Sequence, residues 1–171
     1  MSMLTSVIDD KRAIARAVIT ELEAEVATLT RLALDAADAA THEENKPENE
    51  KDMRSTEASY LAAGQAERVR ELERAIGVLS TMSMRAFDDT GEIALSAIVD
   101  VSIAGKTQTL FLVGDGGGRR ARAKVGTRSI DVQLVTPGSP LGRALVGAVV
   151  GDELEIDTPQ GKRTVEIVSV A

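Results

Sequence analysis

The segment T-H-E-E-N-K-P-E-N-E-K-D-M-R-S-T-E, residues 41–57, separates two long helical patterns. Pro47 lies inside it, and a proline cannot continue a helix because it lacks an N–H group and clashes with the preceding turn. Acidic residues gather in this break, namely Glu43, Glu44, Glu48, Glu50, Asp52 and Glu57. If the flanking helices fold back on each other, the break becomes the acidic tip of a helical rod.

Matching apolar stripes flank the break. Before it, apolar residues recur at three- and four-residue steps, namely Ala15, Val18, Leu22, Val26, Leu29, Ala33, Ala36 and Ala40. After it, the stripe resumes with Ala58, Ala62, Gln65, Val69, Leu72, Ile76 and Leu79. Such spacing indicates amphipathic helices with a near-heptad seam. We therefore predict an antiparallel coiled-coil hairpin over residues 1–82, whose stripes bury each other and whose tip spans about 40–56.

The second part of the chain, residues 83–171, has a β-rich pattern. Apolar–polar alternation predicts strands at 93–103, 107–113, 129–135, 153–157 and 163–170. Two segments predict hairpin turns, D-G-G-G at 115–118 and T-P-Q-G at 158–161. One helix is predicted at 139–146, with Ser139 as its cap and Pro140 at its first position. The fold class is therefore α+β, a helical hairpin followed by a small β-rich domain with one short helix.

Composition narrows the class of protein. The chain has 171 residues with 43% hydrophobic content, which fits one ordinary domain or two small ones. It has no cysteine, which excludes disulfides and thiolate metal sites. No apolar run approaches the ~20 residues that span a bilayer, and no signal-peptide pattern is present, so we expect a cytoplasmic protein without a membrane partner. The net charge of −7 argues against duplex DNA binding, sequence-specific binding included.

A run of motif residues lies between positions 135 and 161, V-T-P-G-S-P-L-G-R-A-L-V-G-A-V-V-G-D-E-L-E-I-D-T-P-Q-G. It resembles the C-terminal signature of the GreA/GreB family of bacterial transcript cleavage factors, an S-P-x-x-R-A-L-x-G run followed by V-G-D, a strand and a T-P-x-G hairpin. Ser139, Pro140 and Arg143 belong to the matching positions. Residues 57–63, E-A-S-Y-L-A-A, resemble the start of the family's second coiled-coil helix, E-N-A-E-Y-x-A-A.

The resemblance implies a fold and a function. The C-terminal domain would be FKBP-like and would dock at the rim of the secondary channel of RNA polymerase, with Ser139, Pro140 and Arg143 as partner-binding residues. The hairpin would enter the channel, where tip acids share a Mg²⁺ ion with the polymerase and stimulate its cleavage of backtracked RNA. The chain would then bind no cofactor alone and would not itself be an enzyme. RNA polymerase is the implied partner, with nascent RNA as a further contact.

The tip departs from the family pattern, D-L-K-E-N, in which two acids lie three residues apart. Glu44 and Glu48 are each followed by asparagine, but neither has an acid three residues before it. Asp52 and Glu57, five residues apart, are the next option for a pair. We expect the tip function to rest on these four residues, and two alternatives stay open. One is a channel-binding regulator or inhibitor that does not stimulate cleavage, and the other is a non-catalytic helical interaction protein.

Two further features have open interpretations. The densest basic run consists of Arg119, Arg120, Arg122 and Lys124. It is either a solvated strand face or a contact for RNA or for an acidic rim of the polymerase. His42, the single histidine, lies beside the acidic break and is either a polar loop residue or a metal ligand.

Overall fold

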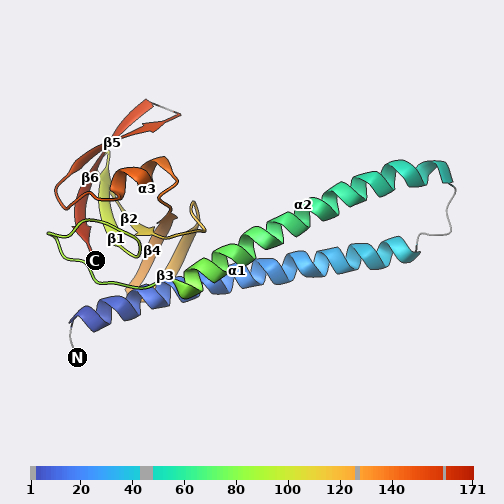
Figure 1. Ribbon diagram of the computed structural model, residues 1–171, viewed down its shortest axis with the longest axis horizontal. Helices are drawn as coiled ribbons and strands as arrows, with labels where there is room; N and C mark the ends of the chain where they lie inside the picture. Colours follow the sequence, from blue (N-terminus) through green and yellow to red (C-terminus); the bar gives the residue numbers. More distant parts are fainter. Residues whose placement is uncertain (1–2, 43–47, 126–127, 160) are drawn as a thin grey trace. The chain divides into compact units, whose positions relative to one another are not determined.

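The computed structural model describes residues 3–42, 48–125, 128–159 and 161–171 (Figure 1). The side chains of 3–5, 39–42, 48–58, 124–125 and 128 lie outside this description. The elements are α1 (Met3–His42), α2 (Glu48–Thr81), β1 (Ile98–Ile103), β2 (Lys106–Leu112), β3 (Arg120–Val125), β4 (Arg128–Val135), α3 (Pro140–Leu145), β5 (Glu153–Thr158) and β6 (Gly161–Val170). The predicted α+β class is confirmed. None of the described helices is long and apolar enough to cross a membrane.

The described chain forms two compact units. One comprises Met1–Ile19 together with Gly77–Ala171, and the other is Thr20–Ile76. The helix α1 therefore contributes its first turns to the unit that contains the sheet and its later turns to the hairpin unit. The sequence analysis placed the boundary between the hairpin and the β-rich domain between residues 82 and 83, and this boundary stays a prediction.

In the hairpin unit, α1 and α2 form the predicted antiparallel pair (Figure 1). Leu22 and Leu72 are buried, with 0% and 2% of their surface exposed. Arg68 joins the two helices, since its Nη2 atom lies 2.9 Å from Glu25 Oε1 on α1 and its Nη1 atom lies 3.1 Å from Glu71 Oε2 on α2. These hydrogen bonds, the one to Glu25 first, raise the pKa of Arg68. They link the two helices beside the buried leucines.

Towards the tip, the described side chains are exposed. Ala33, Ala36 and Ala62 belong to the predicted seam, but all three are exposed, so the mutual burial of the two stripes does not extend to these positions. The reason is geometric, because each helix has one neighbour and an alanine seam covers little area. Large apolar side chains are exposed at the same level, namely Leu32 (47%), Leu34 (62%), Tyr60 (77%) and Leu61 (66%).

Part of the predicted break is helical. The helix α1 extends to His42 and α2 begins at Glu48, directly after Pro47 in the sequence. The segment E-N-E-K-D-M-R consists mostly of good helix formers, and acidic residues in a first helical turn interact favourably with the helix dipole. The acidic residues from Glu48 onwards therefore lie on α2 and not in a loop.

The described strands form a six-stranded sheet with the order β3-β4-β2-β1-β6-β5. All neighbours are antiparallel except β2 and β4, which are parallel. Because β4 lies between β2 and β3, the prediction of a hairpin turn at residues 115–118 is wrong. That segment leads instead to an edge strand, β3, which the sequence did not predict as a separate strand. The predicted β5–β6 hairpin is confirmed, with Thr158 opposite Gly161.

Aliphatic side chains fill both faces of this sheet. A buried cluster joins alternate strand residues to α3 and the turn after it, and includes Val99, Val101, Leu110, Leu112, Val135, Leu145, Ala148, Val165 and Ile167. Phe111 and Val113 are fully buried but lie outside that cluster, so by strand alternation they face the other side of the sheet. In the same unit, Ile14, Ala15 and Val18 of α1 are buried.

Candidate functional site

The short helix α3 begins with a hydrogen-bonded cap. Ser139 Oγ accepts a hydrogen bond from the Gly142 N–H at 3.0 Å and donates one to the Thr136 carbonyl at 2.8 Å. Pro140 follows at the first helical position, where its missing N–H group has no helical partner to lose. The predicted cap and helix are therefore confirmed. Ser139 and Pro140 have a clear structural role, and their predicted contact with a partner stays a prediction.

Other residues of the 135–161 segment also shape the backbone. A Cβ atom at Gly142 would overlap the carbonyl group of Thr136, with only 2.6 Å to its carbon. Gly147 and Gly151 have φ angles of 81° and 90°, a region that favours glycine. The Asp152 carboxylate accepts a hydrogen bond from the Val149 N–H at 2.9 Å. Much of this motif thus closes turns around α3 and β5.

Arg143 differs from its neighbours in the motif. It lies in the last turn of α3 with an exposed side chain. Within the described part of the chain, its guanidinium forms no ion pair or hydrogen bond. Val146, which follows α3, is 48% exposed. This end of α3 therefore presents a cation and an apolar side chain to solvent, a combination suited to a protein partner.

The predicted tip residues fall largely outside the described structure. Glu44 lies among residues that are not described, and the side chain of His42 is not described either. Glu48, Asp52 and Glu57 lie on α2, but their side chains are not described. The backbone places positions 48 and 52 one turn apart at the start of α2. The pairing of the tip acids therefore stays a prediction.

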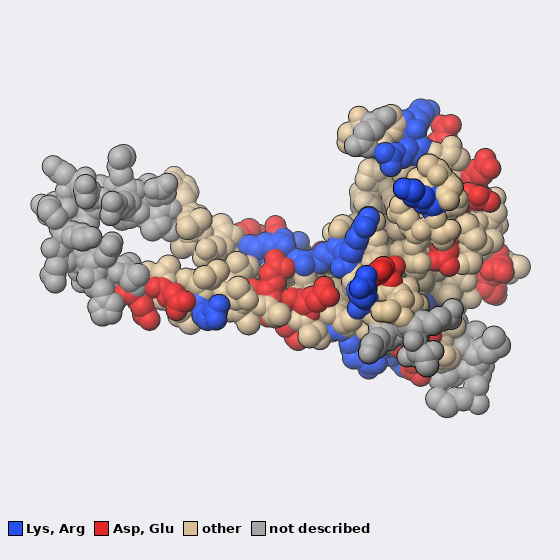
Figure 2. Space-filling view, turned by 180° about the vertical axis from the view of Figure 1, so that it is seen from behind, with Lys and Arg blue, Asp and Glu red and all other residues tan. Residues whose placement is uncertain are grey.

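The basic run lies on and just before the edge strand β3. Arg120 and Arg122 are exposed, and Arg122 forms two hydrogen bonds with the Asp131 carboxylate on β4, at 2.7 and 3.1 Å. These bonds, with the charge of Arg120 as a smaller contribution, lower the pKa of Asp131. Arg120 and Arg122 thus belong to an exposed strand face, while a contact of the run with RNA or with an acidic rim of the polymerase stays a prediction. On the face shown in Figure 2, basic and acidic side chains are interspersed.

The sequence analysis missed a buried lysine. Lys11 on α1 has 0% of its surface exposed, donates a hydrogen bond from Nζ to the Arg85 carbonyl at 2.5 Å, and lies 4.6 Å from the centre of the Phe87 ring. The Arg85 guanidinium lies 5.1 Å from the same ring centre. Burial, and then repulsion by Arg85, lower the pKa of Lys11 to about 8. Lys11 lies four residues before Ala15, so the apolar stripe extended backwards by one step would have pointed to it.

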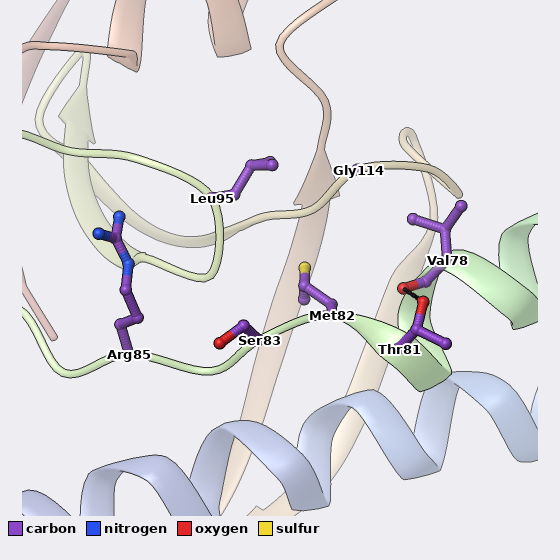
Figure 3. Close-up of a pocket in the computed structure, with 7 residues that line it drawn as sticks. All are labelled: Val78, Thr81, Met82, Ser83, Arg85, Leu95 and Gly114. Carbon is purple, nitrogen blue, oxygen red and sulfur yellow. Dashed lines mark hydrogen bonds between the residues drawn. The ribbon is translucent and has the colours of Figure 1, made fainter.

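Arg85 also borders a pocket in the sheet-containing unit (Figure 3). The pocket has a volume of about 390 Å³, and its lining residues are Val78, Thr81, Met82, Ser83, Arg85, Leu95 and Gly114. The Thr81 hydroxyl donates to the helix carbonyls of Gly77 and Val78, at 2.9 and 3.4 Å. These described lining residues include no carboxylate or imidazole, so they offer no general acid or base.

The sequence of this chain is similar to proteins of a known family. Residues 88–171 match the family model described as "Transcription elongation factor, GreA/GreB, C-term". The transcription elongation factor GreA of Alkalilimnicola ehrlichii is 31% identical over 120 residues, which cover 66% of this chain and 70% of that protein. The chain belongs to the GreA/GreB family. The GreB protein of Neisseria meningitidis serogroup B is also similar, with 30% identity over 125 residues that cover 68% of this chain and 69% of that protein.

The similarity within the GreA/GreB family is uneven along the chain. GreA of Xanthomonas campestris pv. campestris is 35% identical, but over 91 residues that cover 47% of this chain and only 57% of that protein. A solved structure, GreA factor homolog 1 (Gfh1) of Thermus thermophilus, matches with 22% identity over 93% of this chain and 95% of that one, at a TM-score of 0.35. That TM-score is too low to support a statement about function. The family model covers the sheet, α3 and Arg143.

Proposed function

We propose that this chain is a cytoplasmic transcription elongation factor that binds bacterial RNA polymerase, inserts its hairpin into the secondary channel and stimulates cleavage of backtracked RNA. One observation carries the proposal. A pair of long antiparallel helices leads to a strongly acidic segment, and the same chain contains the C-terminal domain of the GreA/GreB family. The family relationship supplies the partner, and the hairpin supplies a means of reaching into a narrow channel.

The two ends of the molecule have different roles in this proposal. Arg143 and the exposed Val146 contact the rim of the polymerase, while Ser139 and Pro140 build the short helix that presents them. The tip acids work in the channel. Their carboxylate oxygens are the ligands that Mg²⁺ takes in proteins, so the donor set suits an ion shared with the polymerase. Bound there, such an ion stabilises charge on the oxygens of the reacting phosphate.

The chemistry belongs to the polymerase in this account. Mg²⁺ is usually bound through one or two carboxylates together with phosphates and water, so tip acids alone would hold it weakly. The positions of Glu48 and Asp52 lie about one turn apart on α2, and in this account both residues add to the acidic charge that the hairpin brings to the polymerase. The chain therefore acts by positioning acidic groups and is not an enzyme in its own right.

A second function is favoured by one observation. The candidate acids at positions 48 and 52 are four residues apart, whereas the family's tip pattern has its acids three residues apart. A hairpin whose acids do not meet the catalytic metal would occupy the channel and regulate or inhibit the polymerase without stimulating cleavage. Both functions require the same docking and differ only at the tip.

A transcript-cleavage assay on stalled, backtracked elongation complexes separates these functions. We expect the native chain to accelerate cleavage. Three variants, Glu44→Ala, Glu48→Ala and Asp52→Ala, are tested singly. We expect the loss of a metal-directed carboxylate to slow cleavage at least tenfold, because it removes charge stabilisation from the reaction. Arg143→Ala should weaken binding to polymerase but leave cleavage at saturating protein unchanged.

The outcomes are distinct. Cleavage that survives every tip substitution would contradict the role of the acids, and Glu57→Ala completes that series. Binding without cleavage by the native chain would favour the regulator. A native chain that does not bind polymerase at all would rule out both, and would leave a non-catalytic helical interaction protein.

A further inference from the structure

The two edges of the sheet carry opposite charges. The strand β3 forms one edge and β5 forms the other. Each edge strand has charged residues at every second position, basic on β3 and acidic on β5, namely Arg120 and Arg122 against Glu153, Glu155 and Asp157. Because successive residues of a strand point to opposite faces, each set lies along one face of its strand. Neither edge strand has a second neighbour among the described strands.

The two charged rows lie on opposite faces of the sheet. Leu154 and Ile156 of β5 pack against the cluster around α3, so the acidic row faces away from α3. On β3, Ala121 and Ala123 are buried outside that cluster, so Arg120 and Arg122 lie on the α3 side. This difference decides how two copies of the sheet can meet.

Strand direction completes the geometry. The pairings along the sheet make β3 and β5 run in the same direction. A half-turn about an axis in the sheet plane, perpendicular to the strands, reverses both the direction of a strand and the face of its side chains. In a second copy turned in this way, β5 runs antiparallel to β3 of the first copy, and its acidic row lies on the same face as the basic row.

One charge of the acidic row faces a like charge within the described sheet. Arg122 is paired with Asp131, and Glu155 is paired with Lys162 at 3.1 Å. Glu153, in contrast, lies directly opposite Glu166 on β6, and both side chains are exposed. Like charges at directly opposite positions destabilise a strand pair. A cation brought to Glu153 from outside would relieve this repulsion.

Charged edge strands ordinarily prevent sheets from pairing with each other. Here, that protection works between like edges only, because two β3 edges or two β5 edges repel while a β3 edge and a β5 edge attract. We propose that the β5 edge of one copy of this chain pairs as an antiparallel strand with the β3 edge of a second copy. Main-chain hydrogen bonds hold the junction, and basic–acidic pairs set its polarity. Because the two edges differ, the association is heterologous and forms a series of oligomers.

Salt alone does not test this proposal, because the net charge of −7 also repels whole copies and salt screens both effects. Exchange of the edge charges does test it. Sedimentation velocity of the native chain should show dimers and larger species that increase with concentration. Two edge variants, Arg120→Glu/Arg122→Glu and Glu153→Lys/Asp157→Lys, should each associate at least tenfold more weakly. An equimolar mixture of the two should associate again, because each reversed edge then meets an edge of opposite charge.

Matched controls alter the net charge without touching the edges. Arg31→Glu/Lys106→Glu changes the net charge as the β3 variant does, and Glu23→Lys/Glu73→Lys changes it as the β5 variant does. Both controls should retain association, and circular dichroism should show that every variant is folded. A native chain that stays monomeric, edge variants that associate as the native chain does, or a mixture that stays monomeric would each overturn the proposal.

Discussion

Gly142→Ala is expected to lower the free energy of unfolding by about 4 kcal/mol or more, the range of the most damaging single substitutions. The added methyl group would overlap the Thr136 carbonyl, whose oxygen also accepts the hydrogen bond from Ser139. Because the obstacle is backbone and not a flexible side chain, the turn that leads into α3 must move. Urea denaturation followed by circular dichroism would measure the loss.

Gly64→Ala is the matched control for this substitution. Gly64 lies on α2 with nothing within 4 Å of an added Cβ atom, so alanine should stabilise the chain by about 0.5–1 kcal/mol through helix propensity. Equal effects of the two substitutions would show that the close approach at Gly142 does not exist.

Lys11 is expected to make the stability of the chain depend on alkaline pH. Its pKa is lowered from 10.5 to about 8 in the folded state, first by burial and then by Arg85. Below pH 8, Lys11 is protonated in both the folded and the unfolded chain, and the folded chain bears the cost of a buried charge. Between about pH 8 and 10.5 the folded state releases its proton first, so the free energy of unfolding rises with pH. At about 1.4 kcal/mol for each pH unit, the full rise is about 3 kcal/mol.

Urea denaturation at pH 7, 8, 9 and 10 would measure this rise. Lys11→Met should flatten the pH dependence, because the methionine keeps much of the apolar stem and carries no proton. Lys106→Met is the control, since Lys106 is exposed at the start of β2 and should leave the slope unchanged. A slope that persists in Lys11→Met would show that another group is responsible.

The hairpin was predictable because its pattern is local. The apolar steps around Leu22 and Leu72 identify both helices, and these residues are buried as expected. The limits of burial were not predictable in the same way. Alanine counts as apolar in a periodic pattern, but it buries little area, so Ala33 and Ala62 fit the stripe and are nevertheless exposed.

The sheet was predictable in content but not in order. Strands such as β2 and β6 follow from alternation within a few residues. The placement of β4 between β2 and β3 depends on contacts between distant segments, and no local signal reports it. The strand β3 was missed as a separate element because its apolar positions are only Ala121, Ala123 and Val125, while arginines dominate the run.

In the candidate site too, features that depend on adjacent residues were predictable, and features that depend on distant residues were not. The cap formed by Ser139 was predictable from the S-P pair, since capping depends on adjacent residues. The burial of Lys11 was not, because it arises from the Arg85 carbonyl and the Phe87 ring, which are distant in sequence. A charged residue on an apolar stripe nevertheless indicates that a polar group accepts its hydrogen bond inside the protein.

The central proposal is that the hairpin enters the secondary channel of RNA polymerase, and photo-crosslinking tests it most directly. A benzophenone amino acid replaces Tyr60, which is 77% exposed on α2, and the labelled chain is bound to a stalled elongation complex. The same probe at Val168, exposed on β6, serves as the comparison. We expect the probe at position 60 to crosslink to the wall of the secondary channel. Crosslinks from position 60 only to the outer surface of the polymerase, or none at all, would contradict the proposal.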